Sequence, residues 1–269
     1  MSIAPDFKIG IRLALRARFV PIAVSLIVVL ALTALLAGQF SGRQPATVTL
    51  DVGLSVIRLG TPLVAVFLLQ ELVLKEFDRR YFLNTLTYPR SRWRFFAGRL
   101  ASVGALTFAL LVALGVALAA ATAAAGRGYA AATPPSLGWP YVITTALIAL
   151  DLLVVVAMGG FLSVVARTPS FAVIGTLGLI LVARSYSVVV ALLEKDPTLV
   201  LSAPTYQSSV SVLGYLLPDL AALDVRMIAL YGRMDFLPPN IEIRALSVFA
   251  YAVAFFGLAV AVFNRRRLE

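Results

Sequence analysis

Two apolar runs with only Arg167 and Thr168 between them read YVITTALIALDLLVVVAMGGFLSVVA over residues 141–166 and PSFAVIGTLGLILVARSYSVVVAL over residues 169–192. The hydrocarbon core of a membrane is about 30 Å thick, and a helix that rises about 1.5 Å per residue crosses it with about 20 apolar residues. Both runs reach this length. We therefore expect a pair of membrane-spanning helices joined by a short turn.

Four further stretches are long and apolar enough to span, near residues 19–39, 53–74, 95–125 and 243–263. The composition agrees, because 61% of the residues are hydrophobic and only 13% are charged, against roughly half apolar residues in soluble domains. The first run is longer than the core of a signal peptide, so we expect it to remain as a span. The sequence predicts an all-α polytopic membrane protein with about six transmembrane helices, forming a single transmembrane domain over residues 1–269.

The net charge of +10 is best explained by membrane topology. A nucleic-acid binder carries its basic residues on a folded surface, whereas here they lie between apolar runs, so we expect no nucleic-acid partner. Fifteen lie in residues 1–18, 75–99, 167 and 265–267, and six lie in the longer loops on the other side. Since basic residues are retained inside, we expect a multi-pass protein of a bacterial-type cytoplasmic (inner) membrane with both termini cytoplasmic.

Two segments look helical but do not look like spans. Residues 2–18 place apolar and basic side chains at parallel four-residue spacing, which is typical of an amphipathic helix lying on membrane lipids; these are Phe7, Ile11 and Leu15 beside Lys8, Arg12 and Arg16. Residues 194–240 are cut by prolines into pieces too short to span. We expect short extracytoplasmic helices there, resting at the outer membrane surface.

The stretch between the second and third spans carries a dense cluster of both charge signs. Glu76 and Asp78 precede Arg79 and Arg80, and the following apolar piece ends at Tyr88, because Pro89 disfavours helical geometry in the residue before it. The sequence predicts a cytoplasmic helix over residues 76–88. A simple connector would need only a few polar turn residues.

This stretch resembles the membrane subunits of ATP-binding-cassette exporters of the second type. In that family an acidic patch follows the second span, then come an apolar helix ending at Tyr-Pro or Thr-Pro, a Ser-Arg step and a Gly-Lys step. The corresponding residues here are Glu76 and Asp78, Tyr88-Pro89, Ser91-Arg92 and Gly98-Arg99, with Arg in place of Lys. Arg79, Arg80 and Tyr81 stand where the family usually has Gly-Thr after the acidic patch.

The resemblance implies that residues 76–88 form a coupling helix that docks on a cytoplasmic ATPase through Glu76, Asp78, Arg79, Arg80, Tyr88 and Arg92. It further implies a half-transporter that pairs with a second permease copy or a related permease. The chain has no Gly-x-x-x-x-Gly-Lys-Ser/Thr loop, so we expect no cofactor in this chain, with ATP and Mg on the partner ATPase. The alternative is that the basic residues only enforce topology and bind anionic lipids.

Two ionisable residues fall inside predicted spans, Asp151 in the fourth and Arg184 in the fifth. Such residues are costly in a membrane and normally face a partner or a wet cavity. At their depths the two could meet as an ion pair, which would either stabilise the bundle or line a substrate path. Arg58 and Glu71, near opposite ends of the second predicted span, could instead reach the two interfaces.

The sequence leaves two rival functions open. A proton-coupled secondary transporter would use the Asp151 and Arg184 pair. An intramembrane enzyme would need Glu71 or Asp151 as acid or base, but the chain contains no cysteine and no histidine, which excludes thiol and imidazole chemistry. We expect an ATP-driven exporter subunit that is not itself an enzyme, moving a substrate that the sequence does not identify.

Overall fold

A computed structural model describes residues 4–75, 92–127, 134–166, 168–195 and 217–265. Six of its helices are long and apolar enough to cross a membrane. They are α2 (Phe19–Phe40), α3 (Pro45–Leu69), α6 (Arg92–Ala125), α7 (Trp139–Val165), α8 (Pro169–Lys195) and α11 (Ile241–Arg265). The chain is thus an all-α multi-pass membrane protein, as the sequence predicts.

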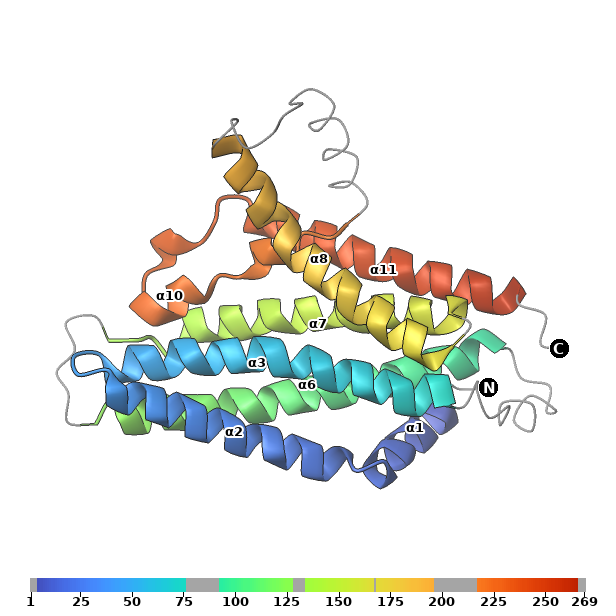
Figure 1. Ribbon diagram of the computed structural model, residues 1–269, viewed down its shortest axis with the longest axis horizontal. Coiled ribbons are helices and arrows are strands. Elements are labelled where there is room, and N and C mark those ends of the chain that lie inside the picture. The colour runs from blue at the N-terminus through green and yellow to red at the C-terminus, as the bar shows by residue number, and fades with distance from the viewer. Residues whose placement is uncertain (1–3, 76–91, 128–133, 167, 196–216, 266–269) are drawn as a thin grey trace.

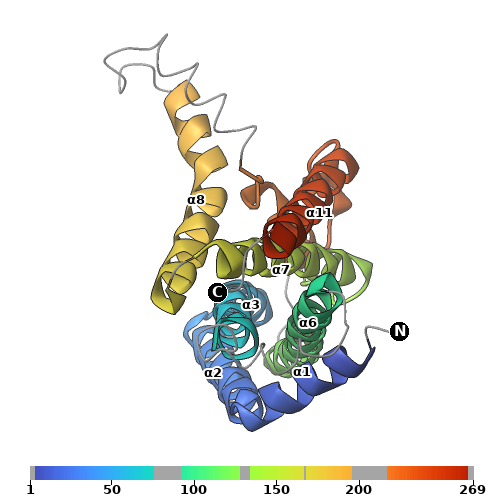
Figure 2. The ribbon, with the colours of Figure 1, turned by 90° about the vertical axis from the view of Figure 1, so that its right-hand side faces the viewer.

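Both termini lie at one end of the bundle, together with the short link between α7 and α8 (Figure 1). We call this the termini end, and the opposite end, with the turn between α2 and α3, the far end. Helices α3, α6 and α7 lie at the centre, α1 (Ala4–Arg16) and α2 flank them, and α11 packs along α7. Helix α8 leans away from the bundle as it leaves the termini end (Figure 2).

Small residues allow the central helices to approach closely. A Cβ atom on Gly53 of α3 would lie 2.1 Å from Leu118 of α6, and one on Gly159 of α7 would lie 2.4 Å from Leu69 of α3. Lipid is as apolar as leucine, so helices in a membrane associate through such close packing rather than through hydrophobic burial alone. The packing fixes α3 between α6 and α7.

The second span begins earlier than predicted. Helix α3 starts at Pro45, not near residue 53, and a π-helix over Gln70–Leu74 continues it toward the termini end. Thr47, Thr49 and Asp51 made this start look too polar. In the structure Thr47 and Thr49 are buried, and the Thr49 hydroxyl donates to the Pro45 carbonyl at 2.8 Å.

Helix α1 (Ala4–Arg16) packs on α6, a contact that the sequence analysis did not predict; it predicted only that the apolar residues of this helix lie on membrane lipids. Its buried residues are Asp6, Gly10 and Ala14, whereas Leu15 is exposed. Short side chains face α6 because the two helices lie very close together. The Ser102 hydroxyl of α6 donates a hydrogen bond to the Phe7 carbonyl of α1 at 3.0 Å. The basic residues Lys8, Arg12 and Arg16 remain exposed, as expected for a helix at a membrane surface.

The described part of the segment before the last span, residues 217–240, packs among the spans, and we call it the inserted segment. The sequence predicts short helices at the outer membrane surface for this segment. Its described part contains 3-10 turns at Ala221–Leu223 and Met234–Phe236 and the short helix α10 (Arg226–Tyr231). Leu220, Leu223 and Ile228 are almost fully buried, and the Leu220 N–H donates to the Ala183 carbonyl of α8 at 3.3 Å. The pieces are too short to span, but their apolar side chains pack among α3, α7, α8 and α11.

Candidate functional site: a charged cavity between α3, α8 and the 219–226 segment

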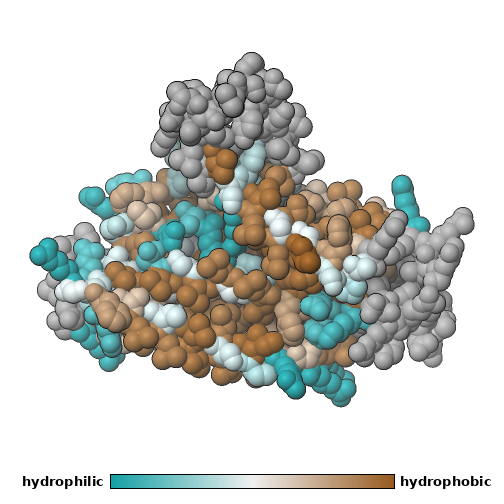
Figure 3. All heavy atoms as spheres, in the orientation of Figure 1, coloured by the Kyte–Doolittle hydropathy of each residue, from teal (hydrophilic) through white to brown (hydrophobic). Residues whose placement is uncertain are grey.

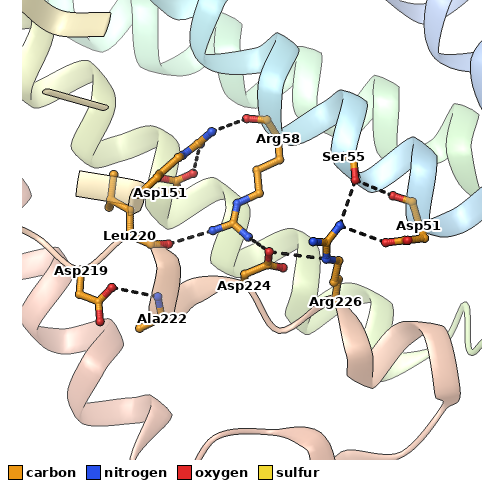
Figure 4. A network of polar contacts seen from close by, with 10 residues as sticks. Asp51, Ser55, Arg58, Asp151, Asp219, Leu220, Ala222, Asp224 and Arg226 are labelled. Carbon is orange, nitrogen blue, oxygen red and sulfur yellow. Dashed lines mark hydrogen bonds and ion pairs between the residues drawn. The ribbon is translucent and has the colours of Figure 1, made fainter. Parts of the chain in front are cut away.

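Arg58 of α3 joins the inserted segment to the bundle. Its guanidinium forms an ion pair with Asp224, and its Nη2 donates to the Leu220 carbonyl at 2.9 Å (Figure 4). Arg58 lies about 20 Å along α3 from Pro45, at about 1.5 Å per residue. Its charge is neutralised by the Asp224 carboxylate of the inserted segment, a partner that the sequence analysis did not predict.

The Asp151 and Arg184 ion pair that the sequence suggested is present. Arg184 Nη2 pairs with Asp151 Oδ2, and Arg184 Nη1 donates to the backbone carbonyl of Arg58 at 2.8 Å. Asp151 is 1% exposed. Because one guanidinium binds both α7 and α3, Arg184 holds three helices together.

Arg226 adds a third set of contacts toward the far end. Its Nη1 lies 3.0 Å from Asp51 Oδ1 and donates at 3.0 Å to Ser55 Oγ, both on α3. Its Nε lies 3.5 Å from Asp224 Oδ2. Asp224 thus bridges Arg58 and Arg226, and the contacts form one network from α7 through α8 and α3 to the inserted segment (Figure 4).

The network holds three carboxylates and three guanidiniums, so its formal charges balance; they belong to Asp51, Asp151, Asp224, Arg58, Arg184 and Arg226. Charges at this depth are stabilised only when they pair or face water. Two buried polar atoms, Asp151 Oδ1 and Arg184 Nε, have no hydrogen-bond partner within the described part of the chain. Every charged group of the network therefore has an oppositely charged partner, but not every polar atom has a hydrogen bond.

A cavity of about 600 Å³ adjoins the network. Arg58, Arg184, Arg226 and Asp224 line it together with apolar residues such as Leu54 and Leu59. Its size falls within the range of small-molecule sites, about 300–1,000 Å³. Figure 3 shows hydrophilic atoms in this region, between α3 and α8, in the middle of an otherwise hydrophobic face.

Only one of the six predicted ATPase-docking residues, Arg92, falls within the described part of the chain. Glu76, Asp78, Arg79, Arg80 and Tyr88 fall outside the described residues. Arg92 begins α6 at the termini end, far from the cavity along the helix axis. Just before the undescribed stretch, Lys75 and Glu71 form an ion pair at 2.5 Å at the end of the π-helix.

Sequence reasoning did not predict the partners of four of the six network residues. Asp51, Asp224 and Arg226 were assigned to loops or to a surface segment, and Arg58 to an interface. The available signal was a set of isolated charges of both signs within apolar stretches, each of which needs a partner in a membrane. The sequence alone did not say which residues pair, because the partners are far apart in the chain.

No family model matches this chain, and no curated protein matches it. The fold and the site define a multi-pass α-helical membrane protein with a charge-lined cavity among its spans.

Proposed function

We propose that this chain is the permease subunit of an ATP-driven exporter, located in a cytoplasmic membrane with the termini end in the cytoplasm. The charged cavity within the membrane-spanning bundle is the observation that carries the proposal. A purely structural bundle gains nothing from exposed charges on an apolar face, whereas a transport path needs a wet, polar lining at that depth. The side chains of Arg226 and Asp224, which line the cavity, are 39% and 29% exposed.

The resemblance of residues 76–99 to exporters of the second type implies that ATP hydrolysis is the energy source for transport. A separate cytoplasmic ATPase would bind residues 76–88, and closure of two such ATPases would move the attached helices α3 and α6. This movement would change the packing around the cavity, because Arg58 and Ser55 lie on α3. A second permease copy or a related permease would complete the path.

The test is charge reversal in the predicted coupling helix. In Glu76→Lys/Asp78→Lys, the carboxylates that would face basic residues of the ATPase groove are replaced, so co-purification with the ATPase and stimulation of ATP hydrolysis should both fall. Glu242→Lys, an exposed acidic residue at the far end, is the matched control. Unchanged binding and stimulation in the double variant would refute the proposal.

A proton-coupled transporter is the second candidate, favoured by the unpaired Oδ1 of the buried Asp151. It predicts transport that follows an imposed pH gradient and needs no ATP. Transport that stops when the ATPase is inactivated, at a constant pH gradient, would exclude this candidate.

A further inference from the structure

The cavity lining offers more hydrogen-bond donors than acceptors. Arg58, Arg184 and Arg226 line it, but Asp224 is the only carboxylate among the described residues that line it. Each guanidinium carries five N–H donors. Arg58 and Arg184 each make two contacts to described residues and Arg226 makes three.

The arginines differ in how far a ligand can reach their donors. Arg184 Nε is buried and lacks an acceptor within the described residues. Arg226 is the most exposed of the three arginines, and its Nε contact with Asp224 is long, at 3.5 Å. An exposed guanidinium with unused N–H donors can bind a planar or tetrahedral oxyanion, because its donors match the spacing of the oxyanion's oxygen atoms.

The rest of the lining is apolar. Leu54, Ile148 and Leu223 lie around the arginines, and Leu59 and Met227 form an exposed rim, at 66% and 42% exposure. A fully hydrophilic ion would leave these surfaces in contact with water. A ligand with a charged head and an apolar body would use both parts of the lining.

We propose that the cavity binds an oxyanion, a phosphate or carboxylate, carried on an apolar group. The head binds Arg226, the most exposed arginine of the lining, and the apolar body lies along Leu59 and Met227. As a statement about cargo this rests on the proposed exporter function. The binding of the oxyanion itself does not depend on the exporter function, because the site lies within one chain and requires no ATPase.

The binding experiment uses the full-length chain purified in an uncharged detergent, with dihexanoyl phosphatidic acid as the probe. Dihexanoylglycerol, which has the same apolar body without the phosphate, and inorganic phosphate, which has no apolar body, are the comparison ligands. We expect phosphatidic acid to bind at least about tenfold more tightly than dihexanoylglycerol, a difference of ~1.4 kcal/mol. Competition by inorganic phosphate would show that the head alone is recognised, and its failure to compete would show that the apolar body is also required.

Arg226→Gln should weaken phosphatidic acid binding about tenfold or more, because it removes a charged donor. Arg233→Gln, an exposed arginine of the same segment outside the cavity lining, should leave the affinity unchanged. If Arg226→Gln does not fold, Leu59→Trp serves instead, since it fills the cavity from an exposed position and keeps every charge. Its affinity should also fall.

Equal binding of phosphatidic acid and dihexanoylglycerol would overturn the proposal, as would equal affinities in the Arg226, Leu59 and Arg233 variants. The two proposals fail separately. If the ATPase co-purifies but no oxyanion binds, only this inference fails. If the oxyanion binds but charge reversal at Glu76 and Asp78 has no effect, the exporter assignment fails and the site stands.

Discussion

At the scale of single residues, Asp151 shows how the membrane forces charges together. Its carboxylate is buried in α7, and Arg184 of α8 both pairs with it and donates to the Arg58 carbonyl of α3 at 2.8 Å. A lone buried charge would cost several kcal/mol. The pair therefore attaches α8 to α7 and α3, although α8 leans away from the bundle.

We predict that Asp151→Ala and Arg184→Ala each destabilise the protein by about 3–5 kcal/mol, because each leaves the other charge buried without its partner. The double variant should lose less than the sum of the two single losses. Thermal unfolding in detergent measures all three proteins. Leu181→Ala, at a 66% exposed position of α8, is the control for side-chain truncation.

Additive losses in the double variant would mean that the two residues do not interact in the folded protein. Normal stability with loss of transport in both single variants would assign the pair to the substrate path instead of to the packing of the bundle.

At the scale of helices, close approach explains the arrangement of α1 and α6. A Cβ atom on Gly98 of α6 would lie 2.7 Å from the Cβ of Asp6 and 3.3 Å from the backbone nitrogen of Phe7. Gly98 belongs to the Gly-Arg step that contributed to the family resemblance. Its physical role in this chain is to let α1 lie close against α6.

We predict that Gly98→Ala destabilises the protein by about 1–3 kcal/mol, since the added methyl group overlaps α1 and must displace it. Gly104→Ala is the matched control, because Gly104 lies on the same helix and a Cβ there would meet nothing within 4 Å. The control should be neutral or stabilising by up to about 1 kcal/mol, through the higher helix propensity of alanine. Thermal unfolding compares the two; equal stabilities would contradict the tight contact between α1 and α6.

The sequence predicted the helices well where length and hydropathy are sufficient. Six spans follow from apolar runs of about 20 residues, and all six are present. The start of α3 was wrong by several residues, because Thr49 satisfies its hydroxyl on its own helix, which a count of polar residues does not register. The face of α1 that packs on α6 was not predicted, because helix-packing distance, not hydrophobicity, selects Gly10 and Ala14.

The site was predictable only in part, for a different reason. Asp151 and Arg184 lie on consecutive spans, so an antiparallel hairpin places them at similar depth. The pairs Arg58 with Asp224 and Asp51 with Arg226 join α3 to a segment far along the chain. Their formation depends on the insertion of residues 219–226 into the bundle, and single-sequence patterns carry no signal for that packing.

At the scale of the whole molecule, the cavity defines a polar region on an apolar body. Large exposed apolar side chains occur on all the spans, among them Leu32, Val116 and Leu246. Lipid can cover those positions. It cannot cover the network face between α3 and α8 (Figure 3) at comparable cost, so we expect water there.

This contrast predicts opposite reactivities for two positions at a similar depth. Ser55 of α3 lies about 15 Å from the far end of its helix, and Val116 of α6 about 13 Å from the same end, at about 1.5 Å per residue. Ser55 is half-buried and lines the cavity, whereas Val116 is 67% exposed. Because the natural chain has no cysteine, single cysteines report each position without background.

In intact membranes, a membrane-impermeant thiol reagent added from outside should modify Ser55→Cys at least about tenfold faster than Val116→Cys, despite the greater exposure of Val116. Thiolate is the reactive form, and a wet cavity beside Arg226 favours it, whereas hydrocarbon suppresses it. Asp235→Cys, at an exposed position of the far end, should react fastest. Faster modification of Val116→Cys would mean that lipid covers the cavity face and water the opposite one, which would remove the basis for a transport path.

Modification of Asp235→Cys only from the cytoplasmic side would reverse the orientation, and the predicted coupling segment at the termini end could then not reach a cytoplasmic ATPase.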